Sequence, residues 1–299
     1  MGQAAYTDSS GHSRERAKTG AYVDWSDEGI FLSGKPLGEA NLIAEVLTLE
    51  HGRHLGLVRG GRSRRIRPTL QPGNLVRVTW RARLAEHLGG YHVELMEAHG
   101  ARVLDDPRAL AAIGTIGELV KLLPERDPHP ELYATTLHVL RSFAEPEIWP
   151  ALLVYWEFQL LQELGFGLDL TSCAATGTTE DLVYVSPKSA RAVSREAGAP
   201  YADKMLPLPR FLIDSTAPLA PADIVAGFDL IGYFLERDVL APHGLKFPAR
   251  GAGCWICCNA RRTPPEAVCR LRRLTGCVKR VTWENARRPP SRGPSNRSI

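Results

Sequence analysis

Short apolar runs, many of them bounded by glycine or proline, follow one another between about residue 24 and residue 103. Turns such as Pro72-Gly73 and Gly89-Gly90 separate them. This spacing of roughly ten residues predicts short strands joined by tight turns, as in a small barrel or sandwich. The five predicted strands are Gly29–Ser33, Leu42–Leu49, His54–Val58, Leu75–Trp80 and Tyr91–Leu95.

Beyond Pro107 the apolar positions recur at helical spacing instead. Asp105 or Asp106 is a candidate N-cap, because a short carboxylate accepts hydrogen bonds from the free N–H groups of a first helical turn. Gly165 is expected to end the third helix. Residues 169–200 are predicted to be irregular, with short extended pieces such as Leu182–Val185. The predicted helices are Pro107–Leu123, Pro130–Phe143, Ile148–Leu164 and Pro221–Leu240.

These patterns predict an α+β protein, in which a five-stranded OB-like β-barrel is followed by a mostly helical domain. We place the barrel at 23–104 and the helical domain at 105–247, with the irregular insert 169–200 inside it. Residues 1–22 are polar and predict a disordered leader. Since organised sequence begins at about Val23, an upstream start-site artefact is the alternative. Residues 248–299 are rich in Arg, Pro and Cys and predict a disordered basic tail.

The formal net charge of +4 conceals a strong segregation of charge along the chain. Counting Lys and Arg against Asp and Glu gives +1 for 1–22, +2 for 23–104, −9 for 105–247 and +10 for 248–299. A negative field repels DNA, so the acidic helical domain is expected to contact proteins. The barrel is then the expected nucleic-acid face.

One stretch of the predicted barrel is rich in arginine and contains no Asp or Glu between Arg53 and Arg83. A cluster of one sign binds phosphates, because neutralising them releases condensed counterions. Its alternative interpretation is a solvated charged surface. The predicted DNA-binding residues are Arg53, Arg59, Arg62, Arg64, Arg65, Arg67, Arg77, Arg81 and Arg83.

Three aromatic side chains in the same region are candidates for stacking on bases: Trp80, Tyr91 and His54. For Trp80 a place in the barrel core is the stronger interpretation, since large aromatic residues are mostly buried. The pair Gly60-Gly61 would let the loop backbone approach a strand closely.

An ordered set of short segments across 24–247 resembles the bacterial recombination mediator family RecO. The segments are Trp25–Ile30, Gly38–Asn41, Gly56–Arg62, Phe158–Gly165, Leu206–Pro209 and Gly232–Leu245. The resemblance implies an OB fold with a helical domain, binding of single- and double-stranded DNA, and annealing of complementary strands. It also implies contacts with RecR and with the C-terminal tail of single-stranded DNA-binding protein, and a role in loading RecA onto coated strands during repair.

Many members of that family carry a C-x2-C…C-x2-C zinc site after the Leu-Gly-Phe segment. Here Cys173 stands at its first position, while Thr176, Ser194 and Ala197 stand at the other three. One thiolate does not hold a structural zinc, so we expect a degenerate zinc-knuckle-like module and no cofactor.

The tail contains a second set of cysteines, spaced C-x2-C-x11-C-x7-C, which resembles a metal site by spacing alone. A shifted reading frame would explain the Arg, Pro and Cys bias of the tail more simply. The candidate zinc ligands are Cys254, Cys257, Cys269 and Cys277.

The sequence lacks the motifs of several enzyme classes. It has no G-x-S-x-G elbow, no phosphate-binding P-loop, no dinucleotide fingerprint and no H-E-x-x-H zinc motif. We therefore expect a protein that is not an enzyme. No stretch approaches 18 consecutive apolar residues and residues 1–20 lack a signal-peptide core, so a cytoplasmic, nucleoid-associated protein with reduced cysteines is expected.

Two other classes of function fit the same sequence. In one, the protein is a non-catalytic adaptor whose helical domain binds a partner and whose arginines keep it soluble. In the other, it is an RNA-binding OB-fold protein, which would prefer RNA through contacts with the 2′-hydroxyl groups.

Overall fold

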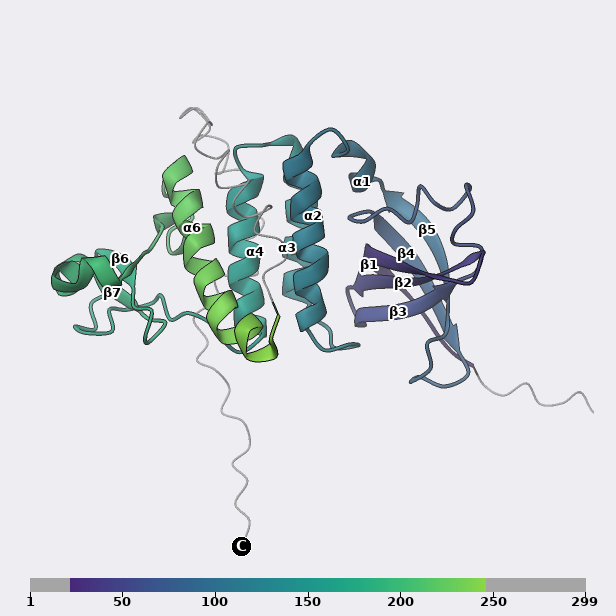
Figure 1. Cartoon of the computed structure of the whole chain (residues 1–299), viewed down its shortest axis with the longest axis horizontal. Coiled ribbons are helices and arrows are strands. Elements are labelled where there is room, and N and C mark those ends of the chain that lie inside the picture. Colours follow the sequence, from purple (N-terminus) through teal and green to yellow (C-terminus); the bar gives the residue numbers. More distant parts are fainter. Residues whose placement is uncertain (1–21, 246–299) are drawn as a thin grey trace, which may run out of the picture.

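The computed structural model describes residues 22–245. A β-barrel lies at one end of the molecule, a row of helices follows it, and a small sheet lies beyond the last helix (Figure 1). The predicted tail with Cys254, Cys257, Cys269 and Cys277 lies outside the described residues, and so does the predicted leader except for Tyr22. The barrel strands are β1 (Val23–Leu37), β2 (Asn41–Thr48), β3 (Gly52–Val58), β4 (Leu75–Ala82) and β5 (Gly90–Glu97).

The five strands close in the order β1-β2-β3-β5-β4, with a single parallel pairing between β3 and β5. Strand β1 is longer than the sequence predicted, because it belongs to both halves of the barrel. Its first part, Val23–Ile30, pairs with β4, and its second part, Gly29–Leu37, pairs with β2. A register shift between Phe31 and Ser33 bends the strand between its two partners. This closure confirms the predicted OB-like barrel.

The strand faces alternate between two separate hydrophobic cores. Inward residues such as Val46 and Val78 fill the barrel. Outward residues Ile30, Leu32 and Leu47 instead belong to the core of the helical region. The outer surface of β1 and β2 is therefore where the barrel and the helices are joined.

The helices begin with α1 (His99–Arg102), a short helix that the sequence analysis missed. Asp106 caps α2 (Pro107–Leu119), since its side chain accepts from the N–H groups of Arg108 and Ala109. Each of the four longest helices has a proline in its first turn, where no intrahelical N–H partner is lost. The others are α3 (Pro130–Arg141), α4 (Trp149–Glu163) and α6 (Pro221–Phe234).

Short 3-10 and π-helical turns continue several helices. The predicted helix Pro107–Leu123 is α2 plus the 3-10 turn η1 (Val120–Leu122), and the predicted Pro221–Leu240 is α6 plus the π-helical segment η5 (Leu235–Leu240). Gly165 follows α4 with a φ of +85°, as expected for a left-handed residue that ends a helix. The remaining 3-10 turns are η2 (Ser142–Ala144), η3 (Ala199–Lys204), η4 (Arg210–Leu212) and η6 (Ala241–His243).

The segment after α4 forms a small three-stranded sheet in the order β7-β6-β8. The predicted extended piece is β6 (Leu182–Val185), whereas β7 (Ala192–Ser194) and β8 (Leu206–Pro207) were not predicted. Two or three residues are too few to show an alternating pattern. The short helix α5 (Arg195–Gly198) follows β7 directly. No helix within residues 22–245 is long and apolar enough to cross a membrane.

Candidate nucleic-acid interface

The loop between β3 and β4 carries most of the exposed arginines of the barrel. Its backbone makes helical turns, with Arg67 N–H donating to Ser63 O at 3.1 Å and Leu70 N–H to Ile66 O at 3.2 Å. Ile66 and Leu70 pack into the barrel core. The loop therefore covers one opening of the barrel with its apolar side and presents its basic side to solvent. We name as the arginine loop its five exposed arginines, Arg59, Arg62, Arg64, Arg65 and Arg67.

Arg62 also ties this loop to the turn between β1 and β2. Its Nη1 donates to Gly38 O at 3.1 Å and to Glu39 O at 3.0 Å, and its backbone N–H donates to Ala40 O at 3.1 Å. Gly60, at a φ of +66°, donates its N–H to Asn41 Oδ1 at 3.2 Å. The loop is thus held in one place by its neighbours, while most of its cationic groups stay free.

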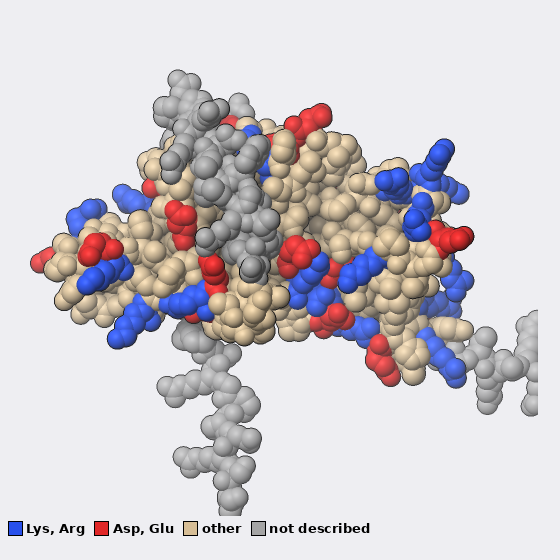
Figure 2. All heavy atoms as spheres, viewed as in Figure 1, with Lys and Arg blue, Asp and Glu red and all other residues tan. Residues whose placement is uncertain are grey.

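The charge of this surface is mainly positive, although Glu39 of the adjoining β1–β2 turn is exposed as well. Lys and Arg side chains gather at the part of the barrel that faces away from the helices (Figure 2). Within residues 22–245 the guanidinium groups of the arginine loop form no ion pair. Unpaired, solvent-exposed guanidinium groups are suited to bind phosphate in a forked, bidentate way.

Arg77, Arg81 and Arg83 form a second, weaker group. Arg77 and Arg81 point outward from β4, and Arg83 is exposed in the β4–β5 loop. Arg77 Nη2 lies 3.4 Å from Glu28 Oε1, so its charge is partly compensated. The guanidinium of Arg81 lies 4.6 Å from the ring centroid of Tyr22. These three arginines therefore offer fewer free guanidinium groups than the arginine loop.

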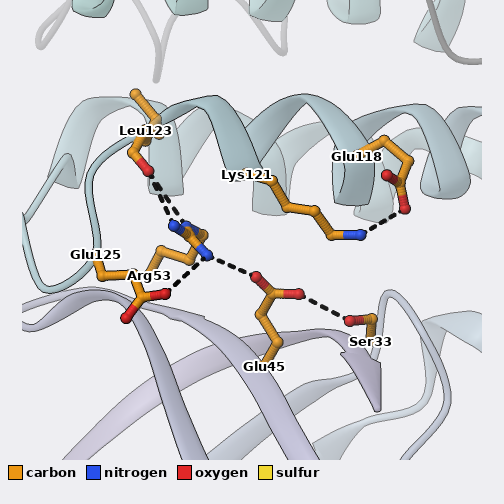
Figure 3. Close-up of polar contacts among 7 residues, drawn as sticks. All are labelled: Ser33, Glu45, Arg53, Glu118, Lys121, Leu123 and Glu125. Carbon is orange, nitrogen blue, oxygen red and sulfur yellow. Dashed lines mark hydrogen bonds and ion pairs between the residues drawn. The ribbon is translucent and has the colours of Figure 1, made fainter. Parts of the chain in front are cut away.

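The structure corrects the prediction for Arg53. Its Nη1 lies 2.8 Å from Glu45 Oε1, while Nε and Nη2 donate to Leu123 O at 3.3 and 3.2 Å (Figure 3). Glu125 lies 3.6 Å away, and the Arg53 side chain is only 12% exposed. Arg53 joins the barrel to the helices, and a phosphate would have to break this network to reach it.

The three predicted stacking residues also lie in the barrel interior. Trp80, His54 and Tyr91 are only 1%, 3% and 6% exposed. The Tyr91 hydroxyl lies 3.0 Å from His54 Nδ1, and Trp80 Nε1 donates to Leu88 O at 2.9 Å. Burial, assisted by the nearby Arg126 charge, lowers the pKa of His54 to about 4, so its ring is neutral at pH 7. These residues stabilise the barrel and are not available to bases.

A half-buried aromatic pair, which the sequence analysis did not single out, lies against the barrel core beside Trp80. The rings of Trp25 and His51 stack with centroids 3.9 Å apart and an interplanar angle of 8°. His51 Nδ1 lies 3.0 Å from Asp27 Oδ2, and Asp27 also accepts from the N–H groups of Glu28 and Glu50. Alternation along β1 places Trp25 and Asp27 on its inward face. This alternation was the only feature of the sequence that could have indicated that the two residues lie close together.

The four positions at which we predicted a degenerate zinc knuckle lie in the small sheet region. The Sγ atom of buried Cys173 accepts from the N–H and the hydroxyl of Ser194 at 3.3 and 3.4 Å. Cys173 N–H donates to Thr178 O at 2.7 Å and closes a turn. No group of three or more His, Cys, Asp or Glu side chains in residues 22–245 is arranged to hold a metal ion. The absence of a cofactor stays a prediction.

Comparisons with known proteins cover both regions. Residues 23–99 match the family model "Recombination protein O N terminal", and residues 104–246 match "Recombination protein O C terminal". The chain is 50% identical over 236 residues to the DNA repair protein RecO of Methylorubrum populi, which covers 77% of this chain and 96% of that protein.

Two further relatives are similar to the same extent. The DNA repair protein RecO of Methylocella silvestris is 50% identical over 228 residues, covering 76% of this chain and 92% of that protein. That of Chelativorans sp. is 50% identical over 232 residues, covering 77% and 94%. With both family models matched in order over most of its length, the chain belongs to the recombination protein O family.

Proposed function

We propose that this protein binds single- and double-stranded DNA through the arginine loop. The observation that carries the proposal is that five arginines are exposed together on a loop anchored by Ile66 and Leu70. Counterion release from phosphates would supply the binding energy, and both forms of DNA offer phosphates.

Annealing of complementary strands follows from the same surface. Two strands repel each other through their phosphates, and a shared layer of arginines would screen both backbones during their encounter. The mechanism requires no bond to be made or broken in the protein, so we propose a mediator that is not an enzyme. Its role would be to help load RecA onto strands coated by single-stranded DNA-binding protein.

The helical domain is proposed as the region that contacts proteins. Its net negative charge disfavours DNA, and exposed apolar side chains such as Phe166 and Tyr233 offer protein-binding surface. The family resemblance suggests two partners, RecR and the C-terminal tail of single-stranded DNA-binding protein. Each would bind to this domain alone or to this domain together with the barrel.

The test is annealing of two complementary oligonucleotides coated with single-stranded DNA-binding protein, with and without this chain. Faster annealing that is suppressed by high salt supports the proposal. Intact DNA binding without acceleration would leave a DNA-binding protein but remove the mediator role. Tight binding of partner peptides with weak DNA binding would favour the adaptor, and a clear preference for RNA of equal sequence would favour the RNA-binding alternative.

A further inference from the structure

Asn74, the last residue of the loop between β3 and β4, joins three parts of the molecule and is only 1% exposed. Its Nδ2 donates to Pro68 O at 2.9 Å and to Thr69 O at 3.1 Å. Its Oδ1 accepts from the N–H of Gly100 in α1 at 3.0 Å. Its backbone oxygen accepts from the N–H of Phe31 in β1 at 2.9 Å. Asn74 therefore connects the β3–β4 loop to the barrel sheet and to α1.

The two carbonyl groups that Asn74 binds lie where the helical turns of the β3–β4 loop end. The N–H groups of Thr69 and Leu70 donate back to Ile66 O, at 3.0 and 3.2 Å. The last carbonyl groups of such turns have no N–H partner ahead of them in the helix. A side-chain amide offers two N–H donors and one acceptor oxygen, so asparagine satisfies both carbonyl groups and the N–H of Gly100 together. An aspartate of the same shape would have no N–H group to donate.

The third part, α1, is fixed in turn to the helical domain. His99 of α1 is only 1% exposed, and its Nε2 lies 3.1 Å from Glu97 Oε2. Glu97 also accepts from Nε of Arg141 in α3 at 3.2 Å. Gly100 lies so close to the β3–β4 loop that a Cβ atom on it would lie 2.8 Å from Pro72 O. The end of the loop is therefore held against an element that α3 supports.

Three cations of the arginine loop lie in the helical turns that Asn74 ends. Arg64, Arg65 and Arg67 are all exposed. Arg62 fixes the beginning of this segment to the β1–β2 turn, and Asn74 fixes its end. Ordering a mobile loop during binding costs free energy, so a loop that is ordered beforehand binds more tightly. Held at both ends, the segment presents its guanidinium groups in one arrangement before DNA is bound.

We propose that Asn74 is a positioning residue for DNA binding, which keeps the arginine loop in place by fixing its end to β1 and α1. Because Asn74 is buried, it acts through the arginines and does not contact DNA. The inference rests on the proposed DNA binding and adds to it a dependence on the helical domain. Through α1, that domain determines where the cations of the loop lie.

The test is Asn74→Ala, a substitution that removes no charge. Fluorescence anisotropy at several salt concentrations measures the affinity of the full chain for a duplex of about thirty base pairs. We expect affinity to fall about tenfold, and the slope of log affinity against log salt to fall by roughly two phosphate contacts. Amide hydrogen exchange of residues 63–70 should become faster. Thr136→Val, the matched control, loses a buried hydrogen bond of α3 and should lower stability without changing the slope.

A double-mutant cycle with Arg67→Gln separates positioning from general stability. Arg67→Gln should weaken DNA binding several-fold in the original chain and very little in Asn74→Ala, since a misplaced guanidinium no longer contacts phosphate. Gly100→Ala disturbs the same junction from α1, because its new Cβ atom would lie 3.3 Å from Asn74 Oδ1 and closer still to Pro72 O. It should weaken binding and lower the salt slope in the same direction.

Unchanged affinity and slope in a folded Asn74→Ala protein, or additive effects in the cycle, would overturn the positioning role. An equal loss of slope in Thr136→Val would do the same, since it would show a general effect of lower stability. If Asn74→Ala did not fold, Gly100→Ala would decide the question by the same measurements. If the unaltered chain bound no DNA, the proposed function itself would fail, which is a distinguishable result.

Discussion

The carboxylate of Glu45 and the guanidinium of Arg53 pair at 2.8 Å on the outer surface of the barrel, where the helices meet it. Both side chains are largely buried, with exposures of 8% and 12%. Ser33 donates to the second carboxylate oxygen at 2.8 Å, so the pair is also fixed from β1. The ion pair therefore contributes to the junction between the two regions.

Arg53→Met should lower the free energy of unfolding by about 3 kcal/mol, because it leaves Glu45 buried without its partner. The combined variant Arg53→Met/Glu45→Gln should recover part of this loss. Urea denaturation followed by circular dichroism measures both values. DNA affinity of the folded Arg53→Met protein should stay within about twofold of the original. A large loss of affinity at unchanged stability would mean that Arg53 contacts DNA after all.

Charge reversal in the arginine loop tests the main DNA contact. Arg62→Glu/Arg64→Glu/Arg65→Glu should nearly abolish binding and reduce the dependence of affinity on salt, since the slope scales with the phosphates neutralised. Anisotropy titrations at several salt concentrations measure this. The matched control reverses three exposed cations of the helical region, Lys188, Lys204 and Arg210, and should leave binding nearly intact. Normal binding by the loop variant would refute the assignment.

Positioning and charge are separable at Arg62. Arg62→Lys keeps the charge but removes the planar guanidinium whose Nη1 donates to both Gly38 O and Glu39 O. We expect a larger loss of DNA affinity, roughly threefold or more, than for Arg64→Lys, and faster amide hydrogen exchange in the loop. Equal effects of the two substitutions would mean that Arg62 acts only through its charge.

His54 makes stability depend on pH. Its pKa is lowered from 6.5 to about 4 in the folded protein, so the unfolded chain binds more protons between these values. Its stabilising contribution is present above about pH 6.5 and declines as the pH falls through this window, by up to about 3 kcal/mol. Denaturation at pH 7 and pH 4.5 should show a smaller difference for His54→Gln than for the original protein. If the two proteins showed the same pH dependence of stability, the lowered pKa of His54 would not be its cause.

Removal of metal should leave the small sheet intact. Only Cys173 among the four zinc-knuckle positions is a cysteine, and its sulfur is held by hydrogen bonds from Ser194. Dialysis against a chelator should therefore leave the melting temperature unchanged, while Ser194→Ala should lower it. Stoichiometric zinc that disappears in Cys173→Ser would contradict this; zinc lost only on deletion of residues 254–277 would instead support the tail site.

Local patterns were sufficient to predict most of the elements. Alternation gave the five strands, and the period of the apolar residues gave α2, α3, α4 and α6. Asp106 and Gly165 act at helix ends through backbone atoms only a few residues away. The double role of β1 was missed, because its partners β2 and β4 lie on opposite sides of it and neither can be read from its own sequence.

What the sequence by itself determined is therefore most of the elements, the OB-like barrel and the basic character of the β3–β4 loop, since these depend on nearby residues and local charge. Only the tertiary structure decided which basic and aromatic side chains stay accessible. Arg53 is removed from solvent by Glu45 and Leu123, and Trp80 by strands that close around it. Burial depends on contacts between distant parts of the chain, and no local pattern encodes which face of the barrel the helices will cover.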